Sequence, residues 1–243
     1  MQIELLHHKL EQVWNKLSNN HVKYLTDIDK DEVLNAAIFE YVEMFSNGKN
    51  LRGYDIGFEV TEQRIEMLKT LVISFPEQEL LNCSKVGENI YAIDLTKTRY
   101  PFRSFRRGSL NVKECSSIVY MNVEQHHDLD NILLNTHRRS SLNFQRAVIT
   151  LRGDKIYIYT SGEFEPLTAD ITYIRKPATV CIGTYPAIEN RNNPLAPNKA
   201  KVDCDLPDDY ADILIAIAKG ELDRRYGDIN GKNLQTEKIV GLT

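Results

Sequence analysis

The first 75 residues repeat their apolar positions at helical spacing. Intervals of three and four residues separate the members of the first stripe, which predicts an amphipathic helix ending near Asn19-Asn20. The stripe consists of Ile3, Leu6, Leu10, Val13 and Leu17.

Two further helices are predicted before Pro76. Asp29 or Asp31 is a suitable cap for the second helix, and Gly48 is a suitable stop. Its stripe is Leu34, Ala37, Ile38, Tyr41, Val42 and Phe45. Thr61 is a suitable cap for the third helix, which carries Ile65, Leu68 and Val72. Three amphipathic helices bury their stripes against one another, so residues 1–75 are expected to form the N-terminal part of a helical bundle.

The period changes to that of β-strands after Pro76. Short runs rich in β-branched and aromatic residues occur at 89–95, 117–123, 146–151, 155–160 and 171–175. Arg152-Gly-Asp-Lys155 joins two of them and is typical of a hairpin. Residues 128–135 fit a short helix. We therefore expect a β-rich insertion over residues 76–177.

The C-terminal part returns to helical spacing. Residues 178–205 are irregular and rich in Pro and Asn, and are interpreted as a docking excursion that packs outside its own domain. A helix follows over 206–228, with Pro207 in its first turn and Asp208 and Asp209 suited to the helix dipole. Its stripe is Tyr210, Ile213, Leu214, Ile217 and Leu222.

These patterns predict an α+β fold. Three N-terminal helices and the C-terminal helix are expected to form a bundle that carries the β-rich insertion, and residues 229–243 are expected to form a polar tail.

Composition narrows the class of protein. A content of 42% hydrophobic and 26% charged residues is typical of soluble globular proteins. No apolar run is long enough for a membrane span, and the N-terminus lacks the features of a signal peptide. The four cysteines form no CxxC pair, which favours reduced thiols in a cytosol over a zinc ribbon or disulfide framework. We therefore expect a protein made in the cytoplasm, without a membrane partner.

Charge is distributed unevenly along the chain. The net charge of −4 combines +5 over residues 99–152 with −6 over residues 27–62 and −5 over residues 203–228. A basic middle between acidic flanks is suited to nucleic acid or to a complementary surface on another copy.

Enzymatic motifs are missing from the sequence. There is no GxSxG, no GxxxxGK[ST] and no GxGxxG, so no nucleophile elbow or phosphate cradle is indicated. The densest group of possible metal ligands has a spacing that matches no established metal motif; it consists of Glu124, His126, His127, Asp128, Asp130 and His137. A metal-dependent enzyme using this group is the least favoured hypothesis, and neither cofactor nor catalytic residue is predicted.

Arginines interleave with aromatic residues at 99–108. The group contains Arg99, Arg103, Arg106 and Arg107, and Arg138 and Arg139 follow later. Arginine binds phosphate and aromatic rings stack on bases, so the group fits a single-stranded nucleic-acid-binding protein. The alternative is a surface loop that contacts acidic helices of a neighbouring subunit, which the acidic whole chain favours.

Short patterns in a shared order resemble the head–tail connector, or adaptor, proteins of tailed bacteriophages, most closely the ring proteins of crAss-like phages. They begin with Asp31-Glu-Val-Leu-Asn-Ala-Ala-Ile-Phe-Glu-Tyr41, which follows the helix containing Val13-Trp14. The run from Leu129 to Asn135 then precedes an Arg-Ala-Val-Ile-Thr strand and its hairpin. The last are Tyr173-Ile-Arg-Lys-Pro177 and the Leu206-Pro-Asp-Asp-Tyr210 helix, which ends in Arg-Tyr-Gly-Asp228.

This resemblance implies a non-enzymatic virion structural protein at the head–tail junction. It implies a ring, usually of twelve copies, that contacts the portal protein and other tail or ring proteins, with DNA passing non-specifically through its channel. The six arginines are then candidates for a subunit interface or a DNA-facing surface. The candidate docking residues are Tyr173, Arg175, Lys176, Pro177, Tyr185, Asn190 and Asn193.

Overall fold

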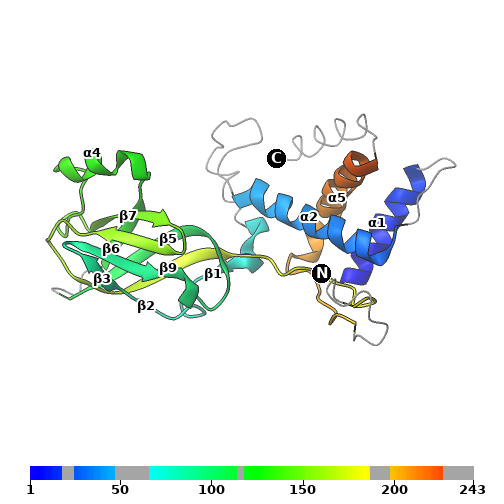
Figure 1. Cartoon of the computed structure of the whole chain (residues 1–243), viewed down its shortest axis with the longest axis horizontal. Helices are drawn as coiled ribbons and strands as arrows, with labels where there is room; N and C mark the ends of the chain where they lie inside the picture. Colours follow the sequence, from blue (N-terminus) through cyan, green and yellow to red (C-terminus); the bar gives the residue numbers. More distant parts are fainter. Residues whose placement is uncertain (18–24, 47–65, 114–117, 187–197, 227–243) are drawn as a thin grey trace. The chain divides into compact units, whose positions relative to one another are not determined.

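The computed structural model describes residues 1–17, 25–46, 66–113, 118–186 and 198–226. The chain divides into two compact units, which differ in secondary structure (Figure 1). The helical unit comprises Met1–Leu71 and Pro177–Thr243, and the sheet unit comprises Val72–Lys176. This composition confirms the α+β class. The sequence pattern places the corresponding boundaries at 75/76 and 177/178.

Three helices pack together in the helical unit. They are α1 (Ile3–Leu17), α2 (Asp27–Ser46) and α5 (Ala211–Tyr226). The predicted stripes lie inside, since Leu6, Leu10, Ile38 and Leu214 are fully or almost fully buried. Among the described helices, none is both long and apolar enough to cross a membrane.

The start of α2 differs from the prediction. The cap is Thr26, whose hydroxyl accepts the N–H of Asp29, while the Asp29 carboxylate accepts the N–H of Thr26. This reciprocal pair is a capping box with aspartate in the usual glutamate position. Asp31 therefore lies inside the helix.

The predicted third helix falls mostly outside the described residues, as does the predicted stop at Gly48. Its described end differs from the prediction, because the 3-10 helix η1 (Lys69–Leu71) is followed by strand β1 (Val72–Ile73). Val72 pairs with Ile174 in a β-ladder and belongs to no helical stripe.

The C-terminal helix begins close to its predicted start. Pro207 has extended backbone geometry and precedes the 3-10 helix η5 (Asp208–Tyr210), which leads directly into α5. The buried side of α5 includes Leu214, Ile217 and Leu222, as predicted.

One sheet forms the core of the sheet unit. Its order is β1-β9-β5-β6-β7-β8-β4-β3, and β2 pairs separately with β9. Neighbouring strands are antiparallel except β6 and β7, which are parallel. The strands after β1 are β2 (Leu81–Asn82), β3 (Ser84–Gly87), β4 (Ile90–Asp94), β5 (Phe102–Val112), β6 (Ile118–Val123), β7 (Arg146–Arg152), β8 (Lys155–Tyr159) and β9 (Pro166–Arg175).

The five predicted runs correspond to β4, β6, β7, β8 and β9, and the β7–β8 hairpin turns at Gly153-Asp154 as predicted. The expectation of a loop around Arg103 is wrong, while the contact with a neighbouring subunit that belonged to the same alternative stays a prediction. Residues 102–112 form β5, which lies between β9 and β6.

The sheet curls around one apolar core. Strand β2 pairs with β9 and also contacts β4, which brings distant parts of the sheet order together. Alternate residues such as Leu110, Val119 and Ile171 point into this core. The outer side carries α4 (Leu129–Leu134), seen on one side of the strands in Figure 1 and preceded by the 3-10 helix η3 (His126–Asp128). Leu129 and Ile132 of α4 pack on Val148 of β7.

Candidate functional site

Two β-bulges place arginines along β5. In its ladder with β9, Phe102 pairs with Arg175 and Ser104 with Ile174, so Arg103 is an extra residue. Phe105 pairs with Tyr173 and Arg107 with Thr172, so Arg106 is a second extra residue. A bulge bends the strand and re-aims a side chain. The first bulge explains why Phe102 and Phe105, three residues apart, both pack against the core of the sheet, and the second does the same for Phe105 and Leu110.

The guanidinium of Arg106 is poorly solvated. The side chain is partly buried, and its Nε and Nη2 atoms have no hydrogen-bond partner in the described part of the chain. Burial lowers the pKa of Arg106, because the charged form loses hydration without gaining a counter-ion. An anion that approaches this guanidinium is therefore stabilised more strongly than one beside a fully hydrated arginine.

Arg103 and Arg107 flank Arg106 on the strand. Arg107 is exposed, and its Nε lies 3.4 Å from the hydroxyl oxygen of Thr172. Among the described carboxylates, none lies within the 4.0 Å ion-pair distance of Arg103, Arg106 or Arg107. We call these three residues the bulge arginines.

Arg99 belongs to a different arrangement, beside Tyr100. The guanidinium carbons of Arg99 and Arg175 lie 5.5 and 5.3 Å from the centre of the Tyr100 ring, within the range of cation–π contacts. Gln78 fixes this corner, since its Oε1 accepts the N–H of Arg99 at 2.9 Å and the hydroxyl of Tyr173 at 3.1 Å.

Arg138 and Arg139 follow α4 and have acidic partners. Arg138 lies 3.7 Å from Glu124, and Arg139 lies 3.5 Å from Glu163. Arg138 and Arg139 therefore differ from the bulge arginines, which have no described carboxylate partner.

The histidine-rich group lies on the exposed surface around η3. His127 contacts Asp128 at 3.3 Å. In the part of the chain that the structure describes, no three His, Cys, Asp or Glu side chains converge on a single metal position.

The candidate docking residues have varied surroundings. Tyr173 is fully buried in the sheet unit, so its side chain is not exposed for docking in the single chain. Lys176 is exposed and Pro177 is buried. Asn190 and Asn193 lie outside the described residues.

The described parts of the predicted excursion form a two-stranded arm. We use this name for residues 178–186 and 198–205. Cys181 pairs with Val202, and Pro186 pairs with Asn198, in antiparallel bridges. The arm contacts α2 of its own unit, and the expectation that the excursion also packs on a neighbour stays a prediction.

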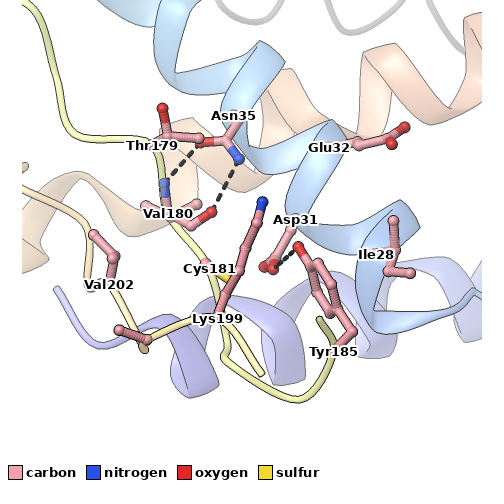
Figure 2. A pocket seen from close by; sticks show the side chains of 11 residues that line it. Ile28, Asp31, Glu32, Asn35, Thr179, Val180, Cys181, Tyr185, Lys199 and Val202 are labelled. Carbon is pink, nitrogen blue, oxygen red and sulfur yellow. Dashed lines mark hydrogen bonds between the residues drawn. The ribbon is translucent and has the colours of Figure 1, made fainter. Parts of the chain in front are cut away.

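Asn35 and Asp31, one helical turn apart on α2, hold the arm. The Asn35 amide donates to the carbonyl of Val180 at 3.0 Å and accepts its N–H at 2.8 Å (Figure 2). Asp31 accepts the N–H of Ile182 at 3.1 Å and the hydroxyl of Tyr185 at 2.7 Å. Sequence reasoning assigned Asp31 only to a cap and gave Asn35 no role.

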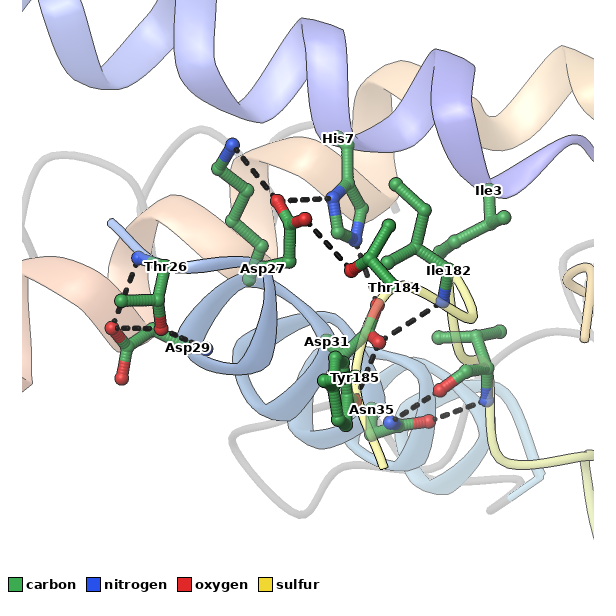
Figure 3. A network of polar contacts seen from close by, with 12 residues as sticks. Ile3, His7, Thr26, Asp27, Asp29, Asp31, Asn35, Ile182, Thr184 and Tyr185 are labelled. Carbon is green, nitrogen blue, oxygen red and sulfur yellow. Dashed lines mark hydrogen bonds and ion pairs between the residues drawn. The ribbon is translucent and has the colours of Figure 1, made fainter. Parts of the chain in front are cut away.

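Asp31 also binds α1. Its Oδ1 lies 2.7 Å from Nε2 of buried His7, and Nδ1 of His7 lies 3.9 Å from Asp27 (Figure 3). Burial by itself would raise the pKa of Asp31, but the bonds from His7, Tyr185 and the Ile182 N–H together hold it below its usual value. Burial raises the pKa of Tyr185, which keeps its hydroxyl a donor.

A pocket of about 450 Å³ lies between α2 and the arm. Its lining includes Ile28, Glu32, Val180 and Val202, with Lys199 and Tyr185 in cation–π contact at 5.7 Å (Figure 2). Asp31 at this pocket accepts hydrogen bonds from the Ile182 N–H and the Tyr185 hydroxyl, so the arrangement is suited to holding the arm.

No protein-family model matches the chain, and a search of curated proteins finds no match.

Proposed function

We propose that this chain is a non-enzymatic structural subunit of a bacteriophage virion, and that it assembles into a ring at the head–tail junction. One observation carries the proposal: the chain holds three bulge arginines without a described carboxylate partner, while its other unit is strongly acidic. The helical unit carries 16 Lys+Arg against 22 Asp+Glu, a net of −6, and the sheet unit carries 14 against 12, a net of +2.

Opposite charges on two units of one chain favour head-to-tail contact between copies. Such a heterologous contact closes into a ring when the rotation between neighbours divides a full turn. The partners in this proposal are other copies, twelve in the ring, together with the portal protein and other tail or ring proteins. DNA passes through the channel without sequence-specific contacts, and no cofactor takes part.

The finer architecture belongs to the same proposal. In it, α1, α2, a third helix before Lys69 and α5 form one bundle, and the sheet unit is an insertion into that bundle. The mutual contacts of α1, α2 and α5 support this arrangement, as does the order of sequence patterns shared with phage connectors.

The mass of the purified chain in solution tests the proposal. We expect closed rings in electron micrographs, and a mass that is an integral multiple of 28.0 kDa. Low ionic strength should favour them, because charged surfaces attract less at high salt. A chain that stays monomeric at all concentrations, and is missing from phage particles, would overturn the proposal.

A second candidate function is binding of single-stranded nucleic acid. The observation in its favour is Tyr100, whose ring lies beside two guanidinium groups at the corner fixed by Gln78. An oligonucleotide should then bind the monomer with strong salt dependence, and Tyr100→Ala should weaken binding by about 1–3 kcal/mol through loss of stacking.

A further inference from the structure

The outer side of α2 carries an acidic stripe. Glu32, Phe39, Glu40 and Glu43 are exposed and recur at helical spacing, so they share one side of the helix. The opposite side is buried and includes Leu34, Ile38, Tyr41 and Phe45. We call these four exposed residues the acidic stripe.

An aromatic side chain lies within this stripe. Phe39 is 42% exposed, and no basic residue occupies the last turn of α2. A large exposed apolar side chain beside carboxylates resembles an interface more than a solvated surface, because aromatic anchors supply much of the binding energy of protein contacts.

The bulge arginines match this stripe in charge and in length. From Arg103 to Arg107 the strand extends at most about 13 Å, at about 3.3 Å per residue. From Glu32 to Glu43 the helix extends about 16 Å, at 1.5 Å per residue. One helix laid along β5 is therefore at least as long as the run of arginines. Glu32, at one end of the stripe, also lies 3.7 Å from Arg225 of its own copy.

A carboxylate partner fits these arginines better than a phosphate backbone does. The whole chain is acidic, with a net charge of −4, and this repels a polyanion. The acidic stripe also supplies an apolar residue, which a phosphate backbone does not use.

We propose that the acidic stripe of α2 in one copy docks on the bulge arginines of β5 in a second copy. The inference rests on the proposed ring and names the two surfaces that form it. Each copy uses each surface once, which is the requirement for a heterologous ring. In this contact the carboxylates of one copy compensate the positive charge of the other copy's bulge arginines, and Phe39 loses its exposure to water.

Charge reversal on the full-length chain tests the pairing. Variant A carries Arg103→Glu and Arg107→Glu, and variant B carries Glu40→Lys and Glu43→Lys. Arg106 stays unchanged, because replacement of a partly buried residue endangers the fold. Each variant alone should lose self-association by at least about tenfold in apparent Kd, because like charges then face one another.

An equimolar mixture of the two variants should assemble again. Variant A has two acidic surfaces and variant B has two basic ones, so alternating copies are complementary at every contact. A matched control, Arg152→Glu with Lys155→Glu on the exposed β7–β8 hairpin, should assemble like the wild type. Thermal unfolding of each variant checks that it folds.

The outcomes separate this inference from the proposed function. Wild-type rings that persist in folded variants A and B would overturn the pairing but leave the ring intact. Failure of the mixture to assemble, with both variants folded, would also overturn it. Unchanged assembly by variant A, together with loss of salt-dependent oligonucleotide binding, would assign the arginines to nucleic acid. A monomeric wild type would instead reject the ring itself.

Discussion

Asn35 binds both main-chain polar groups of Val180 with one side chain. The two bonds, of 3.0 and 2.8 Å, replace the pair that a neighbouring β-strand would supply. The Asn35 side chain on α2 therefore supplies the two hydrogen bonds that the arm would otherwise receive from a neighbouring strand. Because Val180 is buried, both of its main-chain groups depend on this partner.

Asn35→Ala should therefore loosen the arm. Removing this side chain leaves a buried N–H and a buried carbonyl without partners. Each unsatisfied group lowers the free energy of unfolding by about 1–3 kcal/mol. We expect a lower free energy of unfolding in urea and faster hydrogen exchange at the Val180 amide. Asn131→Ala, at an exposed position on α4, is the matched control and should change neither quantity. Unchanged exchange at Val180 in the Asn35 variant would contradict this role.

Asp31 should make the stability of the chain depend on pH in the acid range. Its folded pKa lies below the usual value of 3.8, so its contribution is complete above that value. The contribution is lost as the pH falls through the lower folded pKa. The wild type should thus lose more stability on acidification than Asp31→Asn does.

Urea titrations at pH values from neutral to about 3 measure this difference. Asp154→Asn, on the exposed hairpin, serves as the control and should follow the wild type. Parallel acid dependence of the wild type and Asp31→Asn would show that Asp31 contributes no pH-dependent stability.

Gly108 of β5 lies too close to a side chain of β6 and to the main chain of β9 to carry a Cβ atom without strain. A Cβ atom at this position would lie 2.8 Å from the sulfur of Met121 and 3.1 Å from the main-chain oxygen of Asp170. The sulfur can move, but the main-chain oxygen cannot move easily. We expect Gly108→Ala to destabilise the chain by about 1–3 kcal/mol in denaturant titrations.

Gly87→Ala provides the comparison for this substitution. The nearest atoms to a Cβ there belong to Ile90, at an ordinary contact distance of 3.7 Å. This second variant should change stability by less than about 1 kcal/mol. Equal effects of the two substitutions would mean that the close approach at Gly108 is relieved without cost.

Cys83 should react slowly with alkylating reagents. Burial raises the pKa of its thiol to about 12, compared with a usual value of 9.0. The reactive thiolate is then about a thousandfold rarer at pH 8 than for an unperturbed thiol. Peptide mapping after iodoacetamide treatment should find Cys83 unmodified in the native chain and modified in urea. Rapid native labelling would contradict the burial.

The sequence predicts those helices and strands whose apolar residues keep one spacing, helical or strand-like, without interruption. Leu6 and Leu10 keep helical spacing, and Ile156 and Ile158 keep strand spacing, so their elements follow from the sequence. β5 was not predicted, because the bulge at Arg103 separates the core residues Phe102 and Phe105 by three positions and so hides the strand alternation.

The arm could not be predicted from the sequence for a different reason. Its main anchors, Asp31 and Asn35, act over more than 140 residues of sequence, and no local pattern encodes such a contact. The available signal was a polar pair one turn apart on a helix whose neighbouring positions are apolar. The cluster of arginines at 99–107, in contrast, could be recognised from the composition of the sequence. That Arg138 and Arg139 have acidic partners and the bulge arginines do not could be learned only from the structure.

The pairing of Val72 with Ile174 has a consequence for how the chain is built. The first and last strands of the sheet unit, β1 and β9, are hydrogen-bonded neighbours, so both of its ends leave from one place. Because its two ends lie side by side, recombination can insert such a unit into a loop of another domain. Its removal likewise leaves the two flanking ends close enough to be joined. Residues 72–176 should therefore behave as a cassette that can be exchanged while the surrounding helices keep their connections.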